Sequence, residues 1–314
     1  MTINKGSAST AQPQKRSNVE NMYPLSPMQE GLLFHSLLSP TAGTYVPQIL
    51  LSFSGRVEGA LLKQAWEAAI ARHSILRTGF YWEQRDQPFQ VVYRQPTIAE
   101  DIWIEQDWQQ LSAAEQKAKL DILIAYNRTE PFNLNQPPLM RLTWIRTKNN
   151  AGENCYYLLW CYHHLILDGW SASQLLQEVF QSYFTLTGGI SLSNKATVYS
   201  YGDYIAWLGR QDVTKAESFW QRYLQDWAGP VSLPIQRAYA GAHATDSERK
   251  HLEKPLAEQR RPLSAKATQK LKAFAQTHKI TLNTVVQAAL GLVLSRYCDT
   301  SDVVVGASCA GRPA

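Results

Sequence analysis

The segment from Tyr156 to Phe184 constrains the fold more than any other part of the sequence. Its first part, Tyr156–Tyr162, is a short run of apolar and aromatic residues, which is typical of a buried strand. Its last part, Ser171–Phe184, carries apolar residues at helical spacing. Residues 163–169, with the sequence HHLILDG, connect the two. A strand that leads through a short loop into a helix indicates a fold in which strands and helices are mixed.

The rest of the sequence alternates irregularly between the same two patterns. The other segments with the pattern of strands are Tyr45–Phe53, Leu76–Trp82, Phe89–Tyr93, Ile102–Ile104, Met140–Ile145 and Val303–Val305. The other segments with the pattern of helices are 27–39 after a capping Ser26, Glu58–Ser74, Ala113–Tyr126, Tyr201–Leu208, Ala216–Trp227, a helix capped by Ser264, and Thr281–Tyr297. We therefore expect the α/β class, with a mixed sheet and flanking helices.

Two segments near the C-terminal end are expected to lie in a core. The helix Thr281–Tyr297 would bury the apolar residues that recur along it, which are Val285, Val286, Leu290, Val293 and Leu294. Val303–Val305 would form a short buried strand.

Composition divides the chain into three parts. Residues 1–20 are polar and nearly free of large apolar side chains, so we expect a disordered tail or a docking tail for another protein. Residues 21–192 form a first lobe that contains the HHLILDG segment. Residues 193–314 are a linker and a second lobe, with the boundary near Asn194–Thr197.

The charge pattern excludes some classes of partner. The net charge of +5 is modest for 314 residues, and the basic residues are scattered, so neither a nucleic acid nor a membrane surface is expected as a partner. No apolar run approaches a membrane span, and the N-terminus does not resemble a secretory signal. The four cysteines lack CxxC or metal-ligand spacing, so we expect a cytoplasmic protein with reduced thiols.

The HHLILDG segment carries the residues best suited to chemistry. Neighbouring side chains of a strand point to opposite faces, so only one of His163 and His164 can face a given cleft. A histidine can take and return a proton near neutral pH, as acyl transfer requires. We expect Asp168 to be a buried orienting group with a cationic partner. Gly169 leaves room for an extended substrate arm beside the backbone.

The residues alone leave three other interpretations of this segment. A core histidine followed by a capping aspartate is common at strand ends. A metal site is less well supported, because the helical H-E-x-x-H spacing and a third neutral ligand are missing. A serine hydrolase is also poorly supported, because the sequence has no G-x-S-x-G.

The segment HHLILDG, followed by Trp170 and Ser171, resembles the active-site signature HHxxxDG of the condensation-domain superfamily, whose relatives include chloramphenicol acetyltransferase. Three further stretches resemble motifs of the same family in the same order. They are Ser26–His35 (SPMQEGLLFH), Arg72–Phe80 (RHSILRTGF, where Ser74 replaces a common glutamate) and Tyr201–Trp207 (YGDYIAW). The resemblance implies a condensation domain of a nonribosomal peptide synthetase, with a lobe like chloramphenicol acetyltransferase and a second lobe of the same kind.

The resemblance also implies roles for single residues. His164, the second histidine, would be catalytic, because it would position or deprotonate the acceptor amine that attacks the donor thioester. His163 would pack or hydrogen-bond internally. Asp168 would be structural and held by an arginine, for which Arg77 is the candidate.

The same resemblance implies the path and the carriers of the substrates. Gly169, Trp170 and Ser171 would line the substrate tunnel. The domain itself would bind no cofactor and no metal, since its substrates arrive on the phosphopantetheine of carrier proteins. Its partners would be the upstream and downstream peptidyl carrier proteins, and an adenylation domain would follow in the same chain.

The opening SPMQEGLLFHSL resembles condensation domains that begin a synthetase subunit and join a D-configured donor to an L-amino acid acceptor. In such proteins the N-terminal tail resembles one half of a docking interface with an upstream subunit. The two histidines argue against a heterocyclization domain. The sequence GRPA at the end resembles a loop early in the second lobe, so we expect an incomplete second lobe and little activity of this chain alone.

Three alternative functions remain open at this point. The first is a coenzyme A-dependent acyltransferase of the HxxxD class, which shares the histidine chemistry. The second is an epimerization domain, which shares HHxxxDG. The third is a docking module without catalysis.

Overall fold

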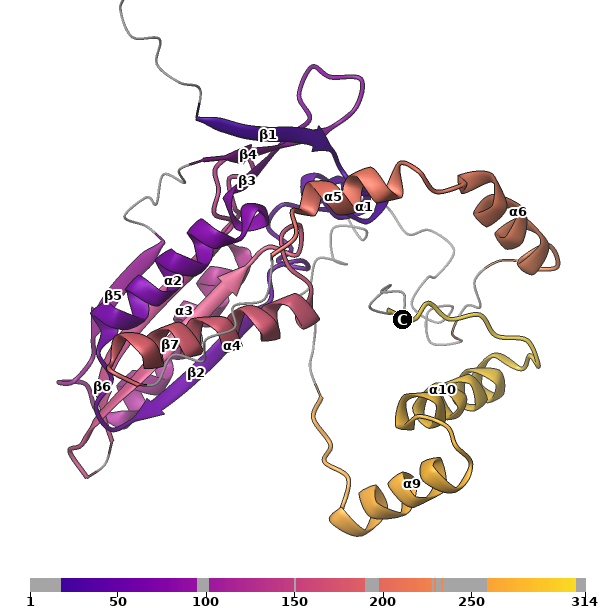
Figure 1. Ribbon diagram of the computed structural model, residues 1–314. Helices are drawn as coiled ribbons and strands as arrows, with labels where there is room; N and C mark the ends of the chain where they lie inside the picture. Colours follow the sequence, from indigo (N-terminus) through magenta and orange to yellow (C-terminus); the bar gives the residue numbers. More distant parts are fainter. Residues whose placement is uncertain are drawn as a thin grey trace, which may run out of the picture. The chain divides into compact units, whose positions relative to one another are not determined.

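The computed structural model describes residues 18–94, 102–149, 151–189, 198–227, 229, 233 and 259–308. The chain divides into two compact units, Met1–Gln211 and Asp212–Ala314. The lobe boundary expected at Asn194–Thr197 and most of the tail expected at 1–20 lie outside the described residues. The α/β class that the sequence predicts is confirmed, because both sheets of the first unit are flanked by helices (Figure 1).

The larger sheet of the first unit has four strands, in the order β2-β7-β6-β5. Their bounds are Gln48–Ser54 for β2, Asn154–Tyr162 for β7, Met140–Lys148 for β6 and Trp103–Asp107 for β5. The β2–β7 and β6–β7 pairs are antiparallel, whereas β5 and β6 are parallel. Strand β7 is therefore central, and the segment that follows it begins in the middle of the sheet.

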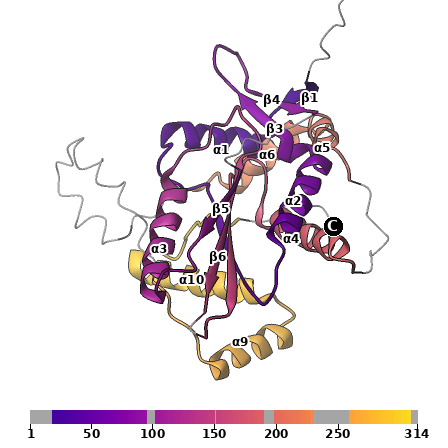
Figure 2. The same ribbon diagram turned by 90° about the vertical axis from the view of Figure 1, so that its left-hand side faces the viewer.

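Helices cover both faces of this sheet. Figures 1 and 2 show α3 (Ala113–Thr129) on one face and the adjacent helices α2 (Gly59–Arg72) and α4 (Gly169–Leu186) on the other. Trp66 of α2 and Trp160 of β7 are almost fully buried, with their ring centroids 4.9 Å apart. Burial of two such large side chains is a major source of stability for this unit.

A smaller sheet with the order β1-β4-β3 completes the first unit. Its strands are β1 (Val19–Pro24), β3 (Thr78–Tyr81) and β4 (Phe89–Tyr93), and the last two form the predicted hairpin. Near it lie α1 (Pro27–Leu38), the 3₁₀ turn η1 (Ser74–Arg77) and α5 (Tyr201–Leu208). Ser26 caps α1 and Pro27 begins it, as the sequence predicts.

The described part of the second unit contains α6 (Val213–Tyr223), α9 (Ala265–Thr277) and α10 (Leu282–Cys298), and Ser264 caps α9 as predicted. Two expectations for this unit are wrong. None of the residues of α10 is buried, and Val303–Val305 does not form a strand. The apolar pattern was correct for a helix, but no sheet lies within the described part of this unit to receive it. Among the described helices, none is both long and apolar enough to cross a bilayer.

Candidate active site

The backbone after β7 stays anchored on both sides before it turns. The His163 N–H donates to the Leu139 carbonyl at 3.0 Å, and the His164 N–H donates to the Tyr45 carbonyl at 2.9 Å. A turn then closes between the Ile166 N–H and the His163 carbonyl at 3.1 Å. Leucine and isoleucine at 165–167 are buried, so the loop is held by apolar packing as well as by hydrogen bonds.

The His163 ring is buried and has a partner at each nitrogen. Its Nδ1 accepts a hydrogen bond from the Leu165 N–H at 3.1 Å. The proton therefore sits on Nε2, which donates to Ser36 Oγ at 3.2 Å. Burial, with a smaller contribution from neighbouring His164, lowers the pKa of His163 to about 4. His163 is thus neutral at physiological pH and is held in one tautomer.

The His164 ring has the opposite tautomer. It is half-buried, and its Nδ1 lies 2.9 Å from the Leu167 carbonyl oxygen. A carbonyl can only accept, so Nδ1 carries a proton, and in the neutral ring the lone pair is on Nε2. Tyr162 meets the ring edge-to-face with the centroids 6.0 Å apart. This arrangement suits a group that accepts a proton at Nε2, because the ring is oriented by its own loop.

Asp168 is a helix cap and not the buried carboxylate expected from the sequence. It is exposed, and its side chain accepts a hydrogen bond at 2.7 Å from the N–H of Ser171 in the first turn of α4. A carboxylate at this position satisfies an otherwise unpaired N–H and interacts favourably with the helix dipole. Asp168 therefore fixes the start of α4 directly after the histidine loop.

The expected ion pair between Arg77 and Asp168 is wrong. Arg77 is buried, and its guanidinium pairs with Glu20 of β1 at 2.7 Å and donates to the Tyr93 carbonyl of β4. The reason is geometric, because Arg77 ends η1 and is directed into the smaller sheet. Arg77 thus supports the sheet beside the histidine loop.

The three residues expected along the substrate path lie at the start of α4. A Cβ added to Gly169 would meet no atom of the described residues within 4 Å. Trp170 is 60% exposed, and Ser171 is half-buried. The backbone at Gly169 is therefore open to a ligand.

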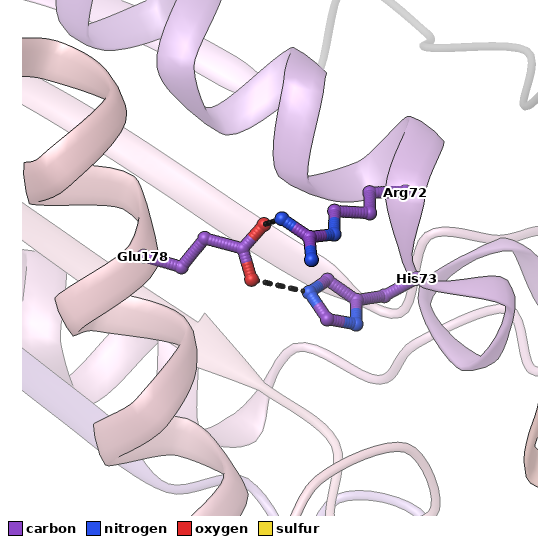
Figure 3. A network of polar contacts seen from close by, with 3 residues as sticks. All are labelled: Arg72, His73 and Glu178. Carbon is purple, nitrogen blue, oxygen red and sulfur yellow. Dashed lines mark hydrogen bonds and ion pairs between the residues drawn. The ribbon is translucent and has the colours of Figure 1, made fainter. Parts of the chain in front are cut away.

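The motif Arg72–Phe80 joins α2 to α4 through its first two residues. The Glu178 carboxylate of α4 binds Arg72 Nη1 at 3.2 Å through one oxygen and His73 Nε2 at 2.7 Å through the other (Figure 3). Arg72 ends α2, and His73 is its C-cap. This bridge holds the body of α4 while Asp168 holds its first turn.

A pocket of about 470 Å³ in the first unit lies between the C-terminal end of α1 and residues 131–135. Its walls include Ser36 and His163, but not His164. Since His164 is not part of its walls, this pocket is not the place where His164 would act. Among the described residues, no group of three or more His, Cys, Asp or Glu side chains is placed to hold a metal ion.

Sequence reasoning missed several residues that support the site. They are Glu20, Gln29, Ser36, Gln90 and Glu178. Only Gln29 had a readable signal, because Ser26 followed three residues later by Gln29 is the pattern of a capping box, which the structure contains. The other four act across large sequence separations, for which the sequence alone offers no local pattern.

Known proteins resemble this chain over nearly its whole length. A family model described as the condensation domain matches residues 19–314. One of the proteins that make up the linear gramicidin synthase of Brevibacillus parabrevis is 37% identical over 297 residues, which cover 95% of this chain and 4% of that protein. Bacitracin synthase 3 of Bacillus licheniformis is 32% identical over 301 residues, which cover 95% of this chain and 4% of that protein. The chain therefore spans a small fraction of these relatives.

Solved structures show the same fold. The first condensation domain of the calcium-dependent antibiotic synthetase matches with a TM-score of 0.67 and 19% identity over 92% of this chain and 64% of that chain. The starter condensation domain of rhizomide synthetase matches with a TM-score of 0.56 and 20% identity over 68% and 50% of the two chains. Condensation domains are acyltransferase-type enzymes that form peptide bonds. Because the family model matches nearly the whole sequence, this chain belongs to the condensation-domain family of nonribosomal peptide synthetases.

Proposed function

We propose that His164 is the catalytic residue for peptide-bond formation in the complete domain to which this chain belongs. The acceptor amine attacks the carbonyl carbon of the donor thioester, the new C–N bond forms, and the C–S bond breaks. The proton lost by the amine passes to His164 Nε2 and then to the departing thiolate sulfur. One observation carries this proposal, which is that the Leu167 carbonyl orients His164 through Nδ1 and leaves Nε2 as a proton acceptor.

Proximity supplies much of the rate in this mechanism. Holding two substrates in a geometry suited to attack lowers the activation barrier by about 7–11 kcal/mol in favourable cases. Phosphopantetheine thioesters on an upstream and a downstream carrier protein are the proposed substrates. We propose that their arms pass Gly169, Trp170 and Ser171, and the open space beside Gly169 supports this path.

The finer specificity is also a proposal. The stretch SPMQEGLLFHSL supports a domain that joins a D-configured donor to an L-amino acid acceptor at the start of a subunit. In that case the tail at 1–20 binds an upstream subunit, an adenylation domain follows in the same chain, and the reaction takes place in the cytoplasm.

We further propose that this chain contains an incomplete second lobe and has little activity alone. The support is the exposed apolar surface of α10, where Val286, Leu292 and Val293 are more than half exposed. The match to the antibiotic synthetase domain also covers only 64% of that chain. Residues that complete a sheet beside α10 would bury this surface.

A dipeptide assay tests the function and its specificity together. The 314-residue chain and a longer protein with a complete condensation domain would each receive a panel of D- and L-aminoacyl groups loaded on an upstream carrier, with L-aminoacyl groups on a downstream carrier. We expect turnover in the longer protein, preference for D-donors and much slower turnover in the short chain. Equal turnover of the two proteins would contradict the incomplete lobe, and preference for L-donors would contradict the subtype.

The same assay separates the alternative functions. Octanoyl coenzyme A offered in place of the loaded upstream carrier tests the coenzyme A-dependent acyltransferase. Faster transfer from free acyl-coenzyme A than from the carrier would favour that function over ours. Inversion of the carrier-bound residue without dipeptide formation would favour an epimerization domain. Carrier binding with no reaction in the complete protein would favour a docking module.

A further inference from the structure

A pair of buried glutamines lies directly beneath the histidine loop. Gln29 of α1 and Gln90 of β4 are 3% and 0% exposed. Gln90 Nε2 donates to Gln29 Oε1 at 2.9 Å, and Gln29 Nε2 donates to Gln90 Oε1 at 3.3 Å. The two side-chain amides therefore form a reciprocal pair that joins α1 to the smaller sheet.

The second N–H of each amide is directed at a backbone carbonyl. Gln29 Nε2 donates to the Leu165 carbonyl at 3.1 Å, and Gln90 Nε2 donates to the Pro24 carbonyl at 3.0 Å. Because a carbonyl can only accept, these bonds fix which way each amide faces. Leu165 is the residue that follows His164, so Gln29 holds the loop from within the core.

The acceptor side of Gln29 is also satisfied. The Ser26 N–H donates to Gln29 Oε1 at 3.0 Å, and the Tyr201 hydroxyl of α5 donates to Ser26 Oγ at 3.2 Å. The network thus connects two of the sequence motifs, at Ser26 and Tyr201, to the histidine loop. A buried polar network of this kind rigidifies its surroundings when every member has a partner.

Helix α1 contacts the loop at a second point. Ser36 lies seven residues after Gln29, which is about two turns and therefore the same face of the helix. Ser36 Oγ accepts from His163 Nε2, while Gln29 binds the Leu165 carbonyl, and the Leu165 N–H donates to His163 Nδ1. His164 lies between these two contacts, so α1 holds the residues on both sides of it.

We propose that Gln29, supported by Gln90, is a positioning residue that sets the orientation of the His164 ring for the reaction. This inference rests on the proposed function of His164. Gln29 touches no substrate in this account. It acts through the Leu165 carbonyl, whose position fixes the loop that brings the Leu167 carbonyl to His164 Nδ1. A displacement of about 1 Å at a reacting group can cost about a hundredfold in rate.

The test replaces Gln29 in the synthetase that contains a complete domain. Gln29→Met keeps the length of the side chain and removes both its donors and its acceptor. The matched control is Gln116→Met on α3, which removes a similar bond from Gln116 Nε2 to the Leu111 carbonyl, at 2.9 Å. We expect Gln29→Met to lower kcat about tenfold or more with KM changed less than threefold, and Gln116→Met to change neither.

The pH dependence of kcat in Gln29→Glu distinguishes a positioning role of Gln29 from a purely structural one. Its ionised carboxylate keeps the acceptor for the Ser26 N–H but offers no donor to Leu165, whereas its protonated form can donate one hydrogen bond. The ratio of its kcat to that of the parent should therefore fall as pH rises, while the ratio for Gln29→Met stays flat. The titratable groups His163 and Tyr201 adjoin the network, His164 and Asp168 lie close to them, and all four remain in every variant. Equal, flat ratios near one for both variants would overturn the proposal.

Nuclear magnetic resonance of the imidazole ¹⁵N nuclei separates failure of this inference from failure of the proposed function. It is measured on the 314-residue chain and needs no substrate. We expect the His164 Nδ1–H signal of the parent to shift or broaden in Gln29→Met and to stay unchanged in Gln116→Met. If the shift occurs but no parent protein forms a dipeptide, the proposed function fails and the structural link stands. If Gln29→Met unfolds, Gln29→Glu is measured instead, and an unchanged His164 signal there would overturn the link.

Discussion

The histidine loop at 163–169 and helix α10 both contain apolar residues, but only those of the loop are buried. In the loop, each polar group of His163 has a partner and the apolar residues at 165–167 are buried. In α10 the apolar residues recur along the helix, yet none of them is buried. The difference teaches that the first unit already contains what holds its candidate catalytic group. The second unit presents apolar surface that has no cover within the described residues.

The largest effect that tests this comparison is expected in the core of the first unit. Trp160→Ala should lower the free energy of unfolding by about 3–5 kcal/mol, because it leaves a cavity beside Trp66. Trp160→Phe is the matched control and should cost clearly less, since the Trp160 Nε1–H has no hydrogen-bond partner in the described part of the chain. Urea unfolding of both variants measures this. Equal losses in the two would contradict the claim that packing decides stability here.

The next effect concerns the pH dependence of stability through His163. Its pKa is about 4 in the folded protein and 6.5 when unfolded, so the unfolded state binds more protons between these values. Stability from this group is therefore complete above pH 6.5 and is lost as pH falls towards 4, by about 3 kcal/mol. Urea unfolding at a series of pH values should show this loss. His163→Gln should remove this part of the slope, and an unchanged slope would show that His163 is not the group responsible.

A smaller effect is expected at the ion pair between Arg77 and Glu20, which the structure contains in place of the expected pair between Arg77 and Asp168. Glu20→Gln should lower the free energy of unfolding by about 1 kcal/mol, because Glu20 is partly exposed while its partner Arg77 is buried. Asp168→Asn should keep the cap of α4 and cost less, since asparagine caps nearly as well as aspartate. Thermal unfolding compares the two. A larger loss for Asp168→Asn would favour the pairing that the sequence suggested.

The smallest effect is expected in α10. Leu290 is 46% exposed, so Leu290→Ser should change the free energy of unfolding by less than about 0.5 kcal/mol in this chain. The same substitution in a protein with a complete second lobe should cost more, because the residue would then be buried. Chemical unfolding of both proteins decides this. Equal and small effects in the two would contradict the proposed incomplete lobe.

Periodicity in the sequence predicted most of the first unit. The helix after Ser26 and the hairpin that ends at Tyr93 follow local rules of capping and alternation. Strand β1 was not predicted, because its residues at 19–21 include polar side chains and its partner β4 is about 70 residues away. A strand that forms only on a distant partner leaves a weak local signal.

The sequence predicted fewer of the residues that hold the candidate site in place. His163, His164 and Asp168 were found from one motif, but the partner of Arg77 was not, because an ion pair between distant segments depends on where each element ends. The burial of α10 was wrong for a related reason. Periodicity shows which side of a helix is apolar, but not whether another element covers that side.

The most direct test of the account is the rate of a single round of dipeptide formation by His164→Ala in a protein with a complete domain, with both carriers loaded in excess. The control is His278→Ala, since His278 lies just after α9 and plays no part in the proposed reaction. We expect His164→Ala to be slower than the parent by about a hundredfold or more, and the control to match the parent. A rate for His164→Ala within threefold of the parent would contradict the central claim that His164 accepts the proton of the attacking amine.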